Sequence, residues 1–125
     1  MAAPAKNGPA GDGVSAYAPE KLLYSIFKKK AASLKAKVKG DTVADRAKWL
    51  AHVRDGEGYM AQFANNKDGS SRIFEVHSPI LNLLERYPII GRFEQDMFET
   101  VLGTRVRREV IRNSGLYECA FHFAA

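Results

Sequence analysis

Two loops rich in turn-forming residues each separate a pair of short segments in which aromatic and β-branched residues are frequent. The loops are residues 65–70, Asn-Asn-Lys-Asp-Gly-Ser, and residues 113–115, Asn-Ser-Gly. Asn and Gly tolerate positive φ, so each loop predicts a β-hairpin, the second with a three-residue turn. The four expected strands are 59–64, 72–77, 104–112 and 116–124. We therefore expect an antiparallel sheet built from two β-hairpins.

Four further segments have apolar residues at helical spacing. The first begins at Pro19, which suits a first helical position, and continues to Gly40 as an amphipathic helix of about 20 residues. The second opens with Thr42 and Asp45, which approximate a capping box. The expected helices are 19–39, 43–55, 79–86 and 90–102. The order α-α-β-β-α-α-β-β predicts an α+β fold with the helices packed on one face of the sheet.

Two helix boundaries have specific signals. Ser78 stands immediately before Pro79, so we expect its hydroxyl to cap the third helix, with proline at the first helical position. Gly103 is expected to end the fourth helix in a left-handed conformation.

On that helix, Glu94 and Glu99 stand among other charged residues, a pattern typical of an exposed face, and no acid/base pair is expected there.

Length and composition indicate one globular domain. The chain has 125 residues, 46% of them hydrophobic, which is enough to bury a core. Residues 1–16 are rich in Ala, Gly and Pro and are expected to form a flexible tail or wing remnant ahead of a single domain over 17–125. The sequence shows neither a membrane-length apolar run nor a signal-peptide core, and one cysteine suits a reducing compartment. We expect a cytoplasmic protein with no membrane partner.

The excess positive charge is confined to the N-terminal half. Of the net charge of +5, residues 1–58 contribute 11 Lys and Arg against 6 Asp and Glu, whereas residues 59–125 have 8 of each. Six lysines cluster towards the end of the first helix, namely Lys28, Lys29, Lys30, Lys35, Lys37 and Lys39. Two interpretations stay open, a solvated helix face or a surface that contacts nucleic-acid phosphates.

Catalytic motifs are missing from the sequence. It contains no nucleophile elbow, phosphate-binding loop or His-Glu-x-x-His pair, so an enzyme is not expected. His77, Cys119 and His122 offer nitrogen and sulfur to a metal, but a cysteine that alternates with phenylalanines along a strand more often fills the core. We therefore expect no metal site.

Arginines crowd one expected strand. They are Arg105, Arg107, Arg108 and Arg112. Such residues either pair across the surface of the sheet or form a wall that binds an acidic effector, and both interpretations stay open.

The motifs of the C-terminal half form a recognisable set. They are Val76-His77-Ser78-Pro79, Tyr87-Pro88, Leu102-Gly103 and Gly115-Leu116-Tyr117-Glu118-Cys119, preceded by Gly58-Tyr59-Met60-Ala61. This set resembles the C-terminal effector domains of winged-helix transcriptional regulators of the ArsR/DeoR-like type, which include iron-sulfur-sensing repressors. It is also similar to the wider group of 4-vinyl-reductase-like small-molecule-binding domains. The resemblance covers residues 46–123.

The resemblance places Ser78, Gly91 and Cys119 where the iron-sulfur sensors have cysteines, at intervals of 13 and 28 residues. Neither Ser nor Gly offers a thiolate, so we expect no iron-sulfur cluster and no other cofactor.

The resemblance further implies a non-catalytic effector-sensing and dimerisation domain. DNA would be contacted only through a winged-helix domain absent from this chain. The expected effector pocket lies between the fourth helix and the last hairpin, at Phe93, Met97, Phe98, Tyr117, Cys119 and Phe121. A homodimer is expected through the first helix, along Leu22, Ile26, Phe27 and Leu34. The alternative function is a basic nucleic-acid-binding module that uses the lysines of that helix.

Overall fold

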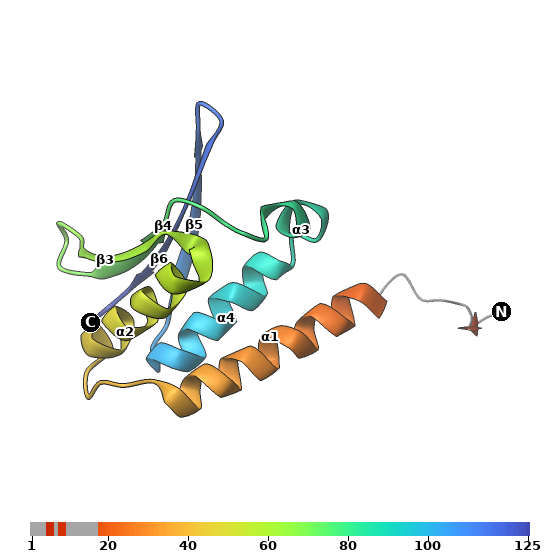
Figure 1. Ribbon diagram of the computed structural model, residues 1–125, viewed down its shortest axis with the longest axis horizontal. Coiled ribbons are helices and arrows are strands. Elements are labelled where there is room, and N and C mark those ends of the chain that lie inside the picture. The colour runs from red at the N-terminus through yellow and green to blue at the C-terminus, as the bar shows by residue number, and fades with distance from the viewer. Residues whose placement is uncertain (1–4, 7, 10–17) are drawn as a thin grey trace.

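The computed structural model describes residues 5–6, 8–9 and 18–125 (Figure 1). The helices are α1 (Ala18–Lys37), α2 (Val43–Arg54), α3 (Leu81–Arg86) and α4 (Ile90–Leu102), with a π-helical turn over Asp55–Tyr59. The strands are β1 (Ala5–Lys6), β2 (Gly8–Pro9), β3 (Ala61–Asn65), β4 (Ser71–Glu75), β5 (Arg107–Asn113) and β6 (Leu116–Phe123). From α1 onward, the α+β class and the predicted element order are confirmed. The tail expected over 1–16 lies outside the described residues, apart from β1 and β2, which pair with each other.

One antiparallel sheet has the strand order β3-β4-β6-β5, so the two predicted hairpins are joined through β4 and β6. Ile73 of β4 lies opposite Phe121 of β6, and both side chains therefore point to the same face. β4 ends at Glu75, which pairs with Cys119, whereas the β5–β6 hairpin continues beyond that pair. As a result, the tip of this hairpin projects past the rest of the sheet (Figure 1).

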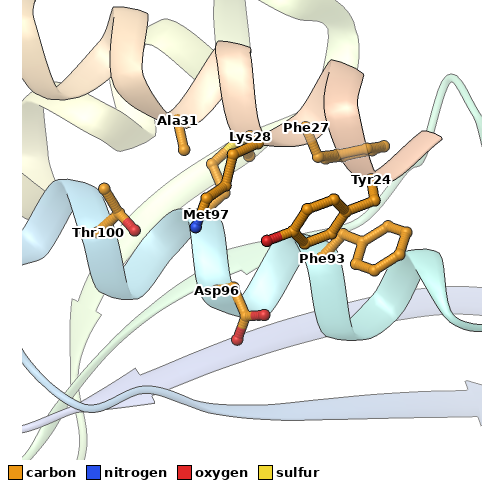
Figure 2. Close-up of a pocket in the computed structure, with 8 residues that line it drawn as sticks. All are labelled: Tyr24, Phe27, Lys28, Ala31, Phe93, Asp96, Met97 and Thr100. Carbon is orange, nitrogen blue, oxygen red and sulfur yellow. The ribbon is translucent and has the colours of Figure 1, made fainter. Parts of the chain in front are cut away.

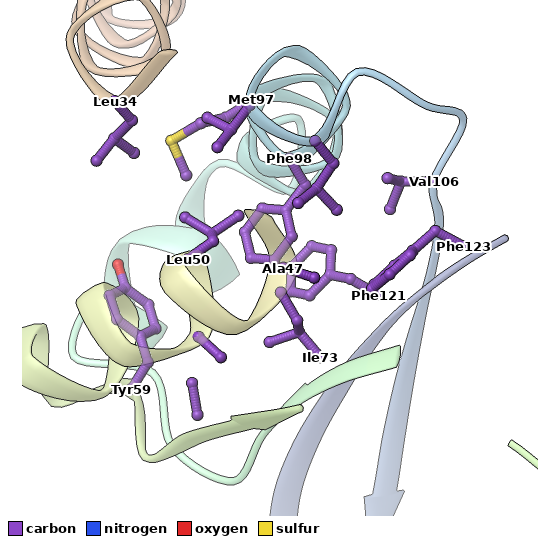
Figure 3. Close-up of a cluster of buried hydrophobic side chains, with 14 of the residues drawn as sticks. Leu34, Ala47, Leu50, Tyr59, Ile73, Met97, Phe98, Val106, Phe121 and Phe123 are labelled. Carbon is purple, nitrogen blue, oxygen red and sulfur yellow. The ribbon is translucent and has the colours of Figure 1, made fainter. Parts of the chain in front are cut away.

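The helices cover one face of this sheet in two layers. α2 packs against β3 and β4, and α4 packs against α2 and β5. α1 lies along α4 on the side away from the sheet, and Figure 3 shows its Leu34 beside Met97 of α4. Within the described residues, none of the helices combines the length and the apolar character that crossing a membrane requires.

The core lies between the sheet and the layer formed by α2 and α4. Phe98 of α4 stacks on Phe121 of β6, with ring centroids 3.7 Å apart and an interplanar angle of 14° (Figure 3). Leu50 of α2 and Ile73 of β4 are fully buried in the same cluster. Each such side chain contributes about 1.5–3 kcal/mol when buried, so this cluster holds α2 and α4 against the sheet.

Two local signals are confirmed and a third is corrected. Thr42 caps α2, because its Oγ1 accepts a hydrogen bond from the Asp45 backbone N–H at 3.0 Å. Gly103 ends α4 with a φ of 74°. The β5–β6 turn contains two residues rather than three, Ser114 and Gly115, and both have positive φ. That conformation is the one a two-residue type I′ turn requires.

Ser78 does not cap α3, so that prediction is wrong. The Leu81 backbone N–H donates to the Ser78 carbonyl at 3.1 Å, which closes a turn before α3 begins at Leu81. This turn separates the serine from the helix and places Pro79 outside it. The Ser78 hydroxyl is buried and has no hydrogen-bond partner among the described residues.

Candidate functional site

A cleft of about 230 Å³ opens between α1, the π-helical turn, the start of α3 and α4. Its lining residues are Leu23, Ile26, Phe27, Lys30, Arg54, Glu57, Tyr59, Ile80, Leu83 and Met97. Most of these side chains are apolar, and they come from segments far apart in the sequence. An apolar cavity of about 150 Å³ holds a benzene molecule. The cleft therefore has room for a substituted aromatic ring or an aliphatic molecule of similar size.

The π-helical turn after α2 shapes one end of the cleft. Gly58 within it has a φ of 96°, and Met60 directly after it has a φ of 51°, so the chain changes direction sharply between α2 and β3. A Cβ at Gly58 would lie 3.3 Å from Pro79 Cγ, and glycine therefore lets this turn approach the loop before α3. The turn buries Tyr59 and brings Glu57 to the edge of the cleft.

An ion pair between α1 and the π-helical turn forms the polar edge of the cleft. Lys30 Nζ lies 2.6 Å from Glu57 Oε2, and both side chains remain partly exposed. Exposed ion pairs are worth about 0–1 kcal/mol, so this pair can open readily. Lys30 belongs to the lysine cluster identified in the sequence, whose other members are exposed.

Arg54 forms the buried floor of the cleft. Its side chain is 2% exposed, and its Nε and Nη2 donate to Glu75 Oε2 and Oε1 at 2.6 and 2.8 Å. Nη2 also donates to Glu94 Oε2 at 3.1 Å. The ring centroid of Tyr59 lies 3.5 Å from the Arg54 Cζ. Because Arg54 ends α2, Glu75 ends β4 and Glu94 lies on α4, this network ties the three elements together. Glu94 is 2% exposed, which corrects the expectation that it belongs to an exposed face.

Burial and charge oppose each other in this network. Desolvation alone lowers the pKa of Arg54, but its hydrogen bonds to Glu75 and the charges of Glu75 and Glu94 raise that pKa above its ordinary value. Burial raises the pKa of Glu75, and the hydrogen bonds from Arg54 oppose the increase. Burial also raises the pKa of Tyr59. At neutral pH the cleft therefore presents a charged arginine, hydrogen-bonded to Glu75 and Glu94, and a protonated phenol.

The carboxylates below the cleft are not free to act as a general base. A general base needs a carboxylate oxygen that can take a proton from the substrate. Both oxygens of Glu75 accept hydrogen bonds from Arg54. One oxygen of Glu94 accepts from Arg54, and the other lies 3.4 Å from Arg108 Nη2. The carboxylates below the cleft are thus engaged with arginines.

Two of the predicted pocket residues, Phe93 and Met97, line a hollow of about 60 Å³ between α1 and α4. Figure 2 shows Phe93 close to Tyr24 of α1, and their ring centroids are 5.5 Å apart. An apolar cavity that holds a benzene molecule measures about 150 Å³, so this hollow is too small to enclose an aromatic ring. Met97 also lines the larger cleft, which makes it the predicted residue that the structure places in the candidate site.

The other four predicted pocket residues lie elsewhere. Phe98 and Phe121 form the stacked pair in the core, and Cys119 is buried beside them. Tyr117 lines a separate hollow next to β5. The structure thus places the cleft on the α1 side of α4, and the side of α4 that faces the last hairpin is packed core.

The three positions that the sequence resemblance aligned with cysteines have different surroundings. Ser78 is buried in the loop before α3. Gly91 lies against Arg108, because a Cβ at Gly91 would be 2.5 Å from Arg108 Nη1. Burial raises the pKa of the Cys119 thiol to about 12, so it is protonated at neutral pH.

Cys119 and His122, two of the three residues considered for a metal, lie on opposite faces of the sheet, and the third, His77, is exposed after the end of β4. Side chains alternate along β6, so His122 points to the opposite face from Cys119. There its Nδ1 lies 3.1 Å from Asn66 Nδ2, and its Nε2 lies 2.9 Å from Glu109 Oε1. Among the residues described by the structure, no three His, Cys, Asp or Glu side chains are grouped to hold a metal ion.

Arg54, Glu75 and Tyr59 were not among the predicted site residues, although the sequence contains signals for the first two. Arg54 follows the buried Leu50 by four residues, so it continues the inward face of α2. Glu75 follows the buried Ile73 by two residues, which places it on the inward face of β4. A charge at an inward helix position and an opposite charge at an inward strand position together indicate a buried ion pair.

Comparison with known proteins gives no relative, because no family model, curated protein or solved structure matches this chain.

Proposed function

We propose that this chain is a non-catalytic effector-binding and dimerisation domain of a transcriptional regulator, and that its effector is a small apolar molecule bound in the cleft. The observation that carries the proposal is the cleft itself, with its volume of about 230 Å³ and its mainly apolar lining. Small-molecule sites are concave and mostly apolar, and the cleft has both properties.

The polar groups of the cleft support this proposal. Small-molecule sites combine apolar walls with a few placed polar groups that orient the ligand. Here Lys30 and Glu57 lie at the edge, while Arg54 and Tyr59 lie on the floor. The floor is fixed by buried hydrogen bonds, and the edge pair is exposed and easily opened. This division suits ligand entry past the edge and recognition at the floor.

The position of α1 suggests how an effector would act. Leu23, Ile26 and Phe27 make α1 one wall of the cleft. In the regulators that the chain resembles, a helix at this position connects the sensor to the DNA-binding head. A ligand in contact with α1 favours the helix position that fits the occupied cleft. In this proposal, DNA is contacted by a winged-helix domain outside this chain.

Dimerisation is assigned to the N-terminal half of α1. Leu22 is 63% exposed and Ile26 is 52% exposed, although both are large apolar residues. Phe27 and Leu34, which belong to the same predicted stripe, pack inside the domain instead. Leu22 does not line the cleft, so a second copy of the chain that packs on Leu22 would remove this side chain from water without filling the cleft.

Indole is a suitable probe for the cleft. We expect it to raise the midpoint of thermal unfolding by about 5 °C or more at ten times its Kd, because it binds only the folded chain. Leu83→Trp places a larger side chain in the cleft and should abolish this increase. Ile111→Trp is the matched control, since Ile111 is exposed on β5 away from the cleft. This variant should keep the increase in the unfolding midpoint. An unchanged midpoint in the wild-type chain, or equal increases in the two variants, would contradict the proposal.

A further inference from the structure

A second large hollow, of about 240 Å³, lies between α3 and the β5–β6 hairpin. Its lining residues are Leu81, Leu84, Glu85, Pro88, Arg108, Val110, Arg112 and Tyr117. None of these residues lines the cleft, so the hollow is a separate site.

Two arginines line this hollow from the same strand. Arg108, Val110 and Arg112 alternate along β5, so their side chains lie on one face of the hairpin. Tyr117 of β6 is the direct partner of Arg112, and its ring centroid lies 5.8 Å from the Arg112 Cζ. The hairpin therefore presents two guanidinium groups and a phenol to the same space.

Arg108 has more hydrogen-bonding capacity than its surroundings use. Its Nη2 lies 3.4 Å from both Glu94 Oε1 and Tyr117 Oη, which is long for a hydrogen bond. Its Nε is buried and has no partner among the described residues. Glu94 makes its shorter contact, 3.1 Å, with Arg54. A guanidinium has five N–H donors, so Arg108 can still bind an acceptor.

The present partner of Arg112 is easily displaced. Nη1 and Nη2 of Arg112 lie 3.3 and 3.4 Å from Glu85 Oε2, and both side chains are 52% exposed. An exposed ion pair of this length contributes little to stability. A ligand anion can therefore replace Glu85 at Arg112 without disturbing the core.

We propose that this hollow binds a small organic carboxylate, with the carboxylate group between Arg108 and Arg112 and the hydrocarbon part against Leu81 and Leu84. The planar guanidinium matches a carboxylate with two parallel hydrogen bonds. Burial raises the pKa of the Tyr117 hydroxyl, which stays protonated and can donate a further hydrogen bond. The apolar wall favours an organic anion over inorganic phosphate, which has no hydrocarbon part to bury.

Calorimetric titration with benzoate tests this site. We expect Arg112→Gln to weaken benzoate binding about tenfold or more, because it removes a charged donor to the carboxylate. Arg107→Gln is the matched control, since Arg107 is exposed and points to the opposite face of β5. The Kd of benzoate for this variant should stay within about twofold of the wild-type value. Benzyl alcohol and inorganic phosphate should each bind at least about tenfold more weakly than benzoate.

Three results would overturn the assignment. These are no benzoate binding by the wild-type chain up to about 10 mM, equal affinities of Arg112→Gln and Arg107→Gln, and phosphate or benzyl alcohol binding as tightly as benzoate. Leu83→Trp alters the other cleft and should leave benzoate binding unchanged. That variant separates failure of this site from failure of the proposed effector cleft.

Discussion

At the scale of single residues, three charged side chains decide how α2, β4 and α4 meet. Arg54 donates two hydrogen bonds to Glu75 and one to Glu94, all shielded from water. Transfer of charges out of water is costly, and the cost is offset only while each charge keeps its partners. Loss of Arg54 would leave two buried carboxylates without their main cation.

Arg54→Ala should therefore lower the free energy of unfolding by about 3–5 kcal/mol. Arg54→Lys should be intermediate, because an ammonium group cannot make the two parallel hydrogen bonds to Glu75. Arg92→Ala is the control, since Arg92 pairs with Asp96 on the exposed side of α4, and should change stability by less than about 0.5 kcal/mol. Urea unfolding at one protein concentration measures all three. A loss for Arg54→Ala no larger than that of the control would refute the structural role assigned to this network.

Residue-level predictions succeeded where the signal was local. Thr42 and Gly103 act on backbone within a few residues, and both were predicted. Arg54 has partners 21 and 40 residues away, and no local pattern identifies them. Glu94 was expected to be exposed because charged neighbours surround it in the sequence. It precedes the buried Met97 by three residues, and that spacing places it on the inward face of α4.

At the scale of elements, the types of the helices and strands were predictable and some boundaries were not. α4 spans the residues predicted, because apolar spacing and a terminal glycine define it. β5 begins three residues later than predicted. The reason is that the Val106 backbone N–H donates to Glu99 Oε2 at 2.8 Å, which anchors this segment to α4 before the strand starts.

α1 is the element whose two halves differ most. Ala31 and Leu34 are buried against the domain, whereas Leu22 and Ile26 in the first half are exposed. The sequence shows one continuous apolar stripe, and it cannot show which part of the stripe the domain itself covers. The exposed part is the surface assigned to the second copy.

Leu22→Asp should convert the proposed dimer into a folded monomer, because the substitution places a charge at the centre of the proposed contact. Leu22 lines neither the cleft nor the hollow at β5, so both pockets should stay unchanged. Ala32→Asp adds the same charge at another exposed position of α1 and should leave the dimer intact. Light scattering coupled to gel filtration gives the mass of each. A monomeric wild-type chain at micromolar concentration, or a dimeric Leu22→Asp variant, would rule out this interface.

At the scale of the whole molecule, the domain consists of the sheet, a layer of α2 and α4, and α1 outside that layer (Figure 1). The sheet and its covered face were predictable, because each segment shows its apolar side in its spacing. The location of the cleft was not, since it depends on where α1 crosses α4 and on how the π-helical turn approaches α3. The stacked Phe98 and Phe121 fill the region where a pocket was expected from the sequence.

Methyl NMR of the chain during titration with indole shows where the ligand binds, and so tests whether the cleft is the effector site. We expect saturable shifts at Leu23, Ile26 and Leu83, which line the cleft, and unchanged methyl signals from Ile73 in the core and Ile111 on β5. If the three cleft residues show no shifts, or if Ile111 shifts as much as they do, binding of the effector in the cleft is contradicted.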